Sequence, residues 1–361
     1  MSGFGRRLQQ AATGNVPNSV APAKETWQPA QIAATAAGTQ VGPNGQYAVY
    51  KMSLKSLTVQ TGDVTLNTPN QVFKGIDFHG MVTNSTSGCV FYSCRFRGSQ
   101  SSANVVVQNF SGGPVTFFDC FFDPTLVNSG TGLVGSNFTC WRSDLWRTVD
   151  GFGPRNPSGQ ANADCYMYNN YVHDLCANLT DGGQKANGVS PGPSHNDCCQ
   201  FQGGNNCEII GNTFLGFVDQ TFGDGPNWNA GTATTGTSTT NNVREFGPNF
   251  QCNSAIQTNQ NNGKPISSGF KISYNYFDGG IFTVNLSNLN GAYGQTIVDE
   301  FVGNRFGHNQ GGYPGNNSFA VNNGGNNTFV DTPSGAQAHI VSWSDNLYAD
   351  NLVAVNNRAT G

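Results

Sequence analysis

The sequence has few charged residues and no long apolar run. Charged side chains make up 11% of the 361 residues, compared with about a quarter in an ordinary globular protein. The net charge of −4 at pH 7 provides no basic field for nucleic acid. No apolar run approaches the roughly 20 residues that a membrane-spanning helix requires. We therefore expect neither nucleic-acid binding nor membrane insertion.

The composition also argues against a helical protein, and the N-terminal residues argue against a signal peptide. Helices depend on Ala, Leu, Glu and Lys, whereas this chain contains 47 glycines and 45 asparagines. Its 25 Phe, 11 Tyr and 5 Trp still supply ample apolar area for a core, which excludes a disordered chain. Arg6 and Arg7 are followed by no apolar segment, so we predict no signal peptide of the general or twin-arginine type.

A short phrase recurs along the chain. Within residues 199–216, two strand-like runs are separated by Gly-Gly-Asn-Asn, and Asn212 precedes Phe214 by two residues. Asn enters left-handed backbone space more easily than most residues, so Asn212 predicts a sharp bend. The predicted bend positions are Cys94, Cys120, Asp144, Asn170, Asn212, Asn275, Asn304 and Asn346. The residues two places later are Phe96, Phe122, Trp146, Val172, Phe214, Phe277, Phe306 and Tyr348.

This internal repeat predicts an all-β protein built as a parallel β-solenoid. A basic coil of about two dozen residues cannot bury its inward face alone, but stacked coils can build a continuous core. The inward aromatics should then form a column, and the bend asparagines should form a hydrogen-bonded ladder. A β-sandwich would instead show hairpin turns every 8–12 residues or so without a repeated bend phrase.

The repeat divides the chain into two parts. Residues 1–45 lack it, and we predict an extended N-terminal arm for attachment, in which Arg6, Arg7 and Trp27 are residue types that often anchor interfaces. Residues 46–361 should form the β-helix. Loop insertions are expected near 177–198, 216–268, 285–295 and 308–327.

The ten cysteines do not predict disulfides or a zinc site. Cys94 and Cys120 occupy equivalent bend positions, as stacked small apolar side chains would. The remaining cysteines lack the paired C-x-x-C spacing of zinc ligands. We predict buried free thiols, no bound metal and no cofactor.

His195 and Asp197 are the candidates for chemistry. Residues at equivalent places in successive coils become neighbours, so carboxylates on adjacent coils could act as an acid/base pair on a glycosidic bond. A His beside an Asp could also serve as an oriented base. The competing interpretation, which we favour, is that both side chains bind backbone groups at the turn into the strand.

Two further groups are weaker candidates. Asp219 and Asp224 could ligate calcium, but no complete calcium-binding loop surrounds them, and a solvated turn is the preferred interpretation. Trp228, Tyr293 and Tyr313 lie in predicted insertions rich in Gly and Asn, where exposed rings could stack on sugars.

The stretch SHNDCCQFQGGNNCEIIGNTF at 194–214 resembles the H-x-D-x-x-Q-x-x-G-G…N-x-F signature of minor tail proteins of actinobacteriophages. These proteins are right-handed parallel β-helices of the pectate-lyase-like superfold. The motif covers only this stretch, whereas the architecture would cover residues 46–357. The arginine motif of pectate lyases is not matched by 147–155, and the polygalacturonase signatures are absent, so no catalytic residue carries over.

The resemblance implies a structural protein at the host-facing end of a virion tail. Such a protein would be made in the host cytoplasm, attach through its arm to other tail proteins and contact host cell-surface polysaccharide. The oligomeric state is left open by the sequence, and a homotrimer is one of the alternatives. The alternative function is a polysaccharide depolymerase, a hydrolase or lyase centred on His195 and Asp197. A secreted carbohydrate-binding β-helix is a third interpretation, which the lack of a signal peptide disfavours.

Overall fold

The computed structural model describes the chain from residue 41 to residue 349, with gaps. Strands account for nearly all of its regular structure, together with one short 3-10 helix, η2 (Leu54–Ser56), and the described residues contain no α-helix. The described ranges are 41–43, 45–46, 48–99, 105–127, 130–155, 163–178, 194–225, 252–259, 268–280, 282–286, 297–307, 321–322 and 339–349.

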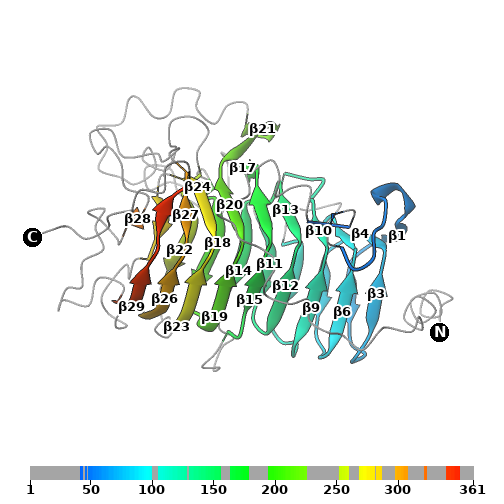
Figure 1. Cartoon of the computed structure of the whole chain (residues 1–361). Helices are drawn as coiled ribbons and strands as arrows, with labels where there is room; N and C mark the ends of the chain where they lie inside the picture. Colours follow the sequence, from blue (N-terminus) through cyan, green and yellow to red (C-terminus); the bar gives the residue numbers. More distant parts are fainter. Residues whose placement is uncertain are drawn as a thin grey trace, which may run out of the picture.

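Three large parallel sheets, here named A, B and C, run the length of the molecule (Figure 1). Sheet A has ten strands, in the spatial order β1 (Thr58–Thr61), β4 (Ile76–His79), β7 (Arg95–Phe96), β10 (Phe121–Phe122), β13 (Asp144–Trp146), β16 (Tyr171–His173), β20 (Thr213–Gly216), β24 (Tyr276–Gly279), β27 (Arg305–Phe306) and β30 (Leu347–Tyr348).

Sheets B and C take the strands between those of sheet A. Sheet B has the order β2 (Val64–Leu66), β5 (Val82–Asn84), β8 (Val107–Asn109), β11 (Thr131–Gly135), β14 (Asp150–Pro154), β18 (Asp197–Gln202), β22 (Ser254–Asn259), β25 (Phe282–Asn285) and β28 (Val321–Asn322). Sheet C has the order β3 (Val72–Lys74), β6 (Cys89–Tyr92), β9 (Val115–Phe118), β12 (Phe138–Trp141), β15 (Tyr166–Tyr168), β19 (Asn205–Ile210), β23 (Ser268–Ser273), β26 (Ile297–Val302) and β29 (His339–Ser344).

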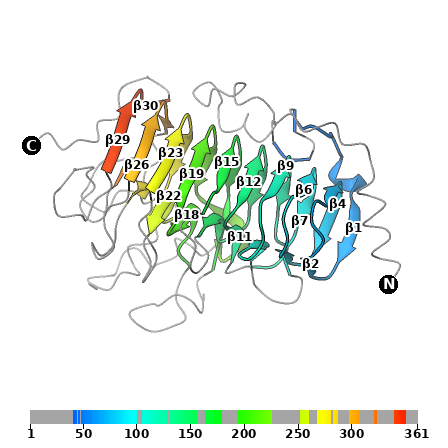
Figure 2. The ribbon, with the colours of Figure 1, turned by 90° about the horizontal axis from the view of Figure 1, so that it is seen from below.

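Each turn of the chain therefore contributes one strand to each sheet, and the coils stack from the blue end to the red end (Figures 1 and 2). This arrangement is consistent with the parallel β-solenoid that the repeat predicts. A small fourth sheet pairs β17 (Leu175–Ala177) with β21 (Val218–Gly223), between the strands of sheets A and B in the chain order. The predicted insertion 216–268 contains β22, which adds a strand to sheet B.

The corner between sheets C and A has the same backbone conformation in every coil. One residue at each corner takes a positive φ, for example Ser93 (50°), Asp119 (56°) and Gly211 (72°). The left-handed residue therefore directly precedes Cys94, Cys120 and Asn212, and the bend residue itself is not left-handed. The repeat phrase located the corner correctly but assigned the left-handed conformation to the wrong residue.

One predicted bend position is wrong by one residue. Phe121 pairs with Asp144 and Phe122 with Leu145, so Ser143, not Asp144, is equivalent to Cys120. Leu145 is fully buried inside the coil, while Trp146 lies on the outside, half-buried. In the phrase WRSDLW, Trp146 was taken for the inward residue because the inward residue of most other coils is aromatic. The inward residue of this coil is Leu145.

Inward aromatic side chains form columns along the axis. Phe214, Phe277 and Phe306 are fully buried. The ring centroid of Phe277 lies 5.5 Å from that of Phe214 and 5.6 Å from that of Phe306. This confirms the predicted column, because stacking at the strand spacing removes each ring from water on both faces. A second column in sheet C includes Phe73, Phe91 and Phe117, with centroids 4.7 Å and 5.0 Å apart.

The predicted asparagine ladder is also confirmed. The Nδ2 of Asn170 donates to the Oδ1 of Asn212 at 2.9 Å, and Asn212 donates in the same way to Asn275 at 3.0 Å. The ladder continues to Asn304 (3.1 Å) and Asn346 (3.0 Å). Each oxygen also accepts from the backbone N–H of the preceding asparagine in the ladder, such as that of Asn170 at 2.9 Å. Buried polar groups are thereby paired in five successive coils.

All ten cysteines are buried and free, as the sequence predicts. Cys94 and Cys120 occupy the ladder position of earlier coils, and each Sγ donates to the carbonyl two residues before it at 3.4 Å. Burial raises the pKa of the Cys94 thiol to about 12, so these side chains pack as small neutral groups rather than as reactive thiolates.

Candidate functional site

The candidate site lies where β14 and β18 begin on sheet B, and two carboxyl groups meet there. Phe152 pairs with Cys199, which makes Asp150 the equivalent of Asp197 one coil earlier. The backbone N–H of Asp197 donates to Oδ1 of Asp150 at 3.0 Å. Asp150 is half-buried as a residue, whereas Asp197 is 0% exposed.

The carboxylate of Asp197 is held by side chains from its own coil and the next. Asn253 donates from Nδ2 to Oδ1 at 3.0 Å, and the Ser254 hydroxyl donates to the same oxygen. Gln200 donates from Nε2 to Oδ2 at 3.1 Å. Three donors on one buried carboxylate fix its orientation. Asp197 is therefore a well-anchored group rather than a mobile one.

Both carboxyl groups titrate above the ordinary range. Burial raises the pKa of Asp197 to about 6, although the hydrogen bond from Ser254 and the charge of His195 act in the opposite direction. Burial, and then the charge of Asp197, raise the pKa of Asp150 well above its usual value. Two neighbouring acids that cannot both ionise freely are the arrangement from which acid/base pairs are made.

A polar row continues from Asp197 along the outer face of β18. Gln200 and Gln202 are half-buried while the intervening Phe201 is fully buried, so the two amides share the outer face. Gln202 donates from Nε2 to Oε1 of Gln200 at 3.0 Å. Since Gln200 donates in turn to Asp197, the three side chains form one oriented hydrogen-bond chain, which runs from the half-buried Gln202 and Gln200 to the buried Asp197.

An arginine and an exposed aromatic ring complete the cluster. Arg155 follows β14, forms a parallel β-bridge with Gln202 and interacts with the charge of Asp150. Its guanidinium carbon lies 5.9 Å from the ring centroid of Phe110, which is 40% exposed. The Nε of Arg155 is buried and has no hydrogen-bond partner among the described residues. The cluster thus combines donors, acceptors and an aromatic face, the elements from which ligand sites are built.

The motif residues divide between folding and this polar face. Asn196 donates from Nδ2 to the carbonyls of Val149 at 2.9 Å and Cys176 at 2.6 Å, which ties the start of β18 to the preceding coil. Asn212 and Phe214 belong to the ladder and to the aromatic column. His195 is half-buried and lies within electrostatic reach of both acids. Only His195, Asp197 and Gln200 of the motif therefore belong to the candidate site.

The structure gives Asp219 a different setting from the solvated turn expected. It lies in β21, is 6% exposed, and receives hydrogen bonds from Arg147 Nε at 2.7 Å and from Thr221. No group of three or more His, Cys, Asp or Glu side chains within the described ranges could hold a metal ion. The guanidinium of Arg147 supplies the positive charge that pairs with the Asp219 carboxylate.

The other predicted site residues lie outside the described residues. These are Trp228, Tyr293 and Tyr313 of the expected sugar-binding group, and Arg6, Arg7 and Trp27 of the arm. Among the helices that the structure describes, none is long and apolar enough to cross a membrane.

Sequence reasoning missed Asp150 and Arg155. The pairing of Asp150 with Asp197 was hidden because the chain between them contains β17 and a longer connection than in the earlier coils. The incorrect bend at Asp144 also shifted the alignment of that coil by one residue. If this coil had been aligned with its neighbours at Ser143 and Leu145, the equivalence of Asp150 and Asp197 could have been recognised.

No family model matches the chain, and neither a curated protein nor a solved structure matches it. The function is therefore argued from the geometry of this site and from the resemblance of the motif.

Proposed function

We propose that the protein is a right-handed parallel β-helix at the host-facing end of a phage tail, and that the outer face of sheet B binds host cell-surface glycan. The hand follows the strong preference for right-handed connections between parallel strands. The tail assignment rests on the motif at 194–214, most of which supports coil formation. The binding assignment rests on the polar face itself.

The hydrogen-bond chain from Gln202 through Gln200 to Asp197 is the observation that carries glycan binding. Amide side chains donate and accept at once, which matches the hydroxyl groups of a sugar. Phe110 offers an exposed ring beside Arg155, and an apolar ring face packs well against the C–H face of a sugar. A rigid sheet holds all these groups in fixed positions, so little entropy is lost on binding.

Binding is tested with the purified protein and host cell-wall polysaccharide in a pull-down or by calorimetry. The double variant Gln200→Ala/Gln202→Ala and the single variant Phe110→Ala should each weaken binding by about tenfold or more, since each removes contacts worth about 1–2 kcal/mol. Lys271→Ala, on the outer face of sheet C, is the matched surface control and should bind normally. Equal binding by all variants would rule out this face.

A second candidate function is cleavage of the bound glycan, which the Asp150–Asp197 pair favours. Burial and the charge of Asp197 raise the pKa of Asp150, which suits a proton donor to a glycosidic oxygen. The test is release of new reducing or unsaturated ends from the polysaccharide by the wild-type protein and by Asp150→Asn. Release that Asp150→Asn abolishes supports cleavage, and binding without any release restricts the function to adhesion.

The tail assignment has its own test. Antibodies against the protein should label the distal end of the tail in electron micrographs of purified virions. Particles that contain the protein elsewhere, or lack it, would contradict the assignment while leaving glycan binding intact.

A further inference from the structure

The segment before β1 forms a compact loop on the outside of the coils. The corner loop, which consists of residues 41–43, 45–46 and 48–52, is closed by a hydrogen bond from Met52 N–H to the Pro43 carbonyl at 2.7 Å. Inside it, Gly45 N–H donates to Gly42 and Ala48 N–H to Gly45, both at 3.1 Å. The loop therefore has a fold of its own, separate from the strand ladders.

The corner loop touches four successive corners between sheets C and A. Gly42 N–H donates to the Arg142 carbonyl at 2.8 Å, and Val49 N–H donates to Oδ2 of Asp119 at 2.8 Å. The Ser93 hydroxyl donates to the Tyr50 carbonyl at 2.5 Å. Met52 reaches Gly75, where an added Cβ would lie 2.4 Å from its terminal methyl group. Four coils are thus tied together from outside.

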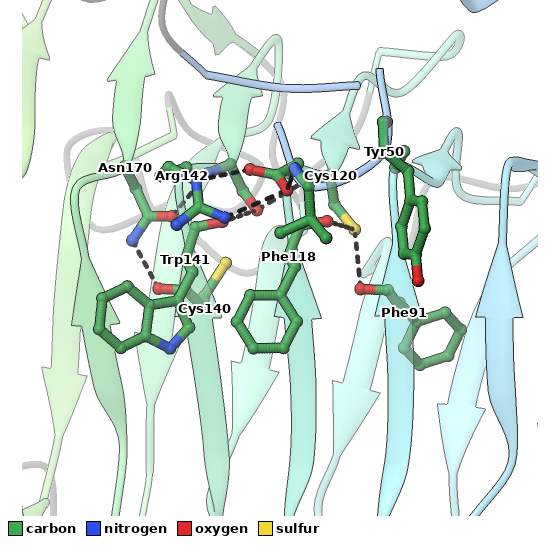
Figure 3. Close-up of polar contacts among 12 residues, drawn as sticks. Tyr50, Phe91, Phe118, Cys120, Cys140, Trp141, Arg142 and Asn170 are labelled. Carbon is green, nitrogen blue, oxygen red and sulfur yellow. Dashed lines mark hydrogen bonds and ion pairs between the residues drawn. The ribbon is translucent and has the colours of Figure 1, made fainter. Parts of the chain in front are cut away.

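Arg142, which is labelled in Figure 3, forms the central ion pair with Asp119. Arg142 donates from Nε to Oδ1 at 2.7 Å and from Nη2 to Oδ2 at 3.2 Å, and both side chains are buried. The Oδ2 that accepts from Arg142 also accepts from Val49 N–H. One carboxylate therefore links two corners and the corner loop. Burial raises the pKa of Asp119 despite the guanidinium.

The corner loop replaces the asparagine ladder in these coils. Where the loop covers the corner, the ladder position is occupied by Cys94, Cys120 and Ser143, which cannot form the amide chain. Where the ladder runs, from Asn170 to Asn346, no described residue of the loop reaches the corner. The two devices meet at one corner, where the loop binds the Arg142 carbonyl and Ser143 N–H donates to Asn170 Oδ1 at 2.9 Å.

We infer that the corner loop is a separable strap that opens and closes on intact coils, with the Asp119–Arg142 pair as its latch. The contacts of the strap are a few hydrogen bonds and the packing of Tyr50, whose ring lies 5.2 Å from that of Tyr92 and 3.2 Å from the Nζ of Lys74. The coils, in contrast, are held together by continuous hydrogen-bond ladders and a buried core. Segments with few buried contacts open locally at much lower free energy than the fold itself. Val41 is 2% exposed and Gly42 N–H is bonded to the Arg142 carbonyl, so the first residues of the strap lie against the coils.

Hydrogen exchange of the full-length protein tests this inference. The amides of Gly42, Val49 and Met52 should exchange by local opening, at rates insensitive to low denaturant. Amides in the core of β12 should follow global unfolding. Asp119→Gly removes the latch without backbone strain, since glycine adopts the positive φ of that position freely, and should speed exchange of the strap amides at least tenfold while leaving β12 unchanged.

Two comparisons make the test decisive. Asp77→Ala breaks a similar two-bond pair, to Arg97 at 2.8 Å and 2.9 Å, which accepts no hydrogen bond from the described residues of the strap, and should leave the strap amides unchanged. Arg142→Gly offers a second route to the same opening if Asp119→Gly does not fold. Strap amides that exchange at the β12 rate, or that ignore both latch variants, would overturn the inference.

Discussion

Asn212 and Asn275 stand 63 residues apart in the chain, yet the Nδ2 of Asn212 donates to the Oδ1 of Asn275 at 3.0 Å inside the protein. The same Oδ1 accepts from the Asn212 backbone N–H at 2.9 Å. A long insertion between the two coils therefore does not disturb their register. The ladder pins the corner of each coil to the next, and the sheets propagate that register along the axis.

Removing one rung of the ladder should destabilise the protein. In Asn275→Ala, the partners of Asn275 lose their donors and acceptors, and each buried group left unpaired costs about 1–3 kcal/mol. Asn275→Ser should cost less, because Ser143 already fills this position one coil before the ladder and accepts from Cys120 N–H at 3.1 Å. Chemical denaturation measures both. Equal losses for Ala and Ser would mean that the amide chain contributes nothing beyond its volume.

The aromatic column gives a second stability prediction. Phe277 is fully buried between Phe214 and Phe306. Phe277→Ala should therefore lower the free energy of unfolding by about 3–5 kcal/mol, through lost burial and the cavity that remains. Leu215→Ala, at a half-buried position on the outer face of sheet A, serves as the control and should cost clearly less. A similar loss at both positions would contradict the inward register.

His173 should make the stability depend on pH above neutrality. Burial alone would lower its pKa, but hydrogen bonds with Asp144 at 3.0 Å and Asp174 at 2.6 Å outweigh it and raise the pKa to about 9. The folded state then binds this proton more tightly than the unfolded state, whose histidine titrates near 6.5. The stabilisation is complete below pH 6.5 and is lost as the pH rises through about 9.

Thermal melts between pH 6 and 10 check this expectation. The wild-type melting temperature should fall across the window, and His173→Gln should show a flatter profile with a lower value at pH 6. Parallel profiles for the two proteins would mean that the histidine is neutral in the fold.

The Asp150–Asp197 pair predicts a different window. The folded pKa of Asp197, about 6, lies above the ordinary 3.8, so its contribution is greatest at low pH and is lost as the pH rises from about 4 through 6. Asp197→Asn cannot titrate and should remove part of this dependence. Glu208→Gln, on the outer face of sheet C, is the control. If Asp197→Asn retains the full dependence, another group is responsible.

Much of the architecture could be predicted because the coil repeats its own chemistry. An aromatic two residues after an Asn is visible in sequence, and stacking then requires both the column and the ladder. Asp144 was misplaced because Leu145 carries no aromatic signal at the inward position. Asp150 was missed because the pairing of β14 with β18 depends on coil register across connections of unequal length. The corner loop was not predicted either, since its contacts with Asp119 and Arg142 are made by backbone groups.

The final prediction concerns the arm and its root. Deleting residues 1–40 removes none of the strap contacts that the structure describes, so the melting temperature should change little. Deleting residues 1–52 also removes the bonds to Arg142, Asp119 and Ser93 and should lower the melting temperature by several degrees. If the arm binds neighbouring tail proteins, as the resemblance of the motif implies, both deletions should abolish incorporation into particles. The melting temperature and incorporation are then measured on the same two variants. Assembly of the 1–40 deletion would assign the attachment surface to the coils. Equal melting of the two variants would mean that the strap adds nothing to the stability of the four coils beneath it.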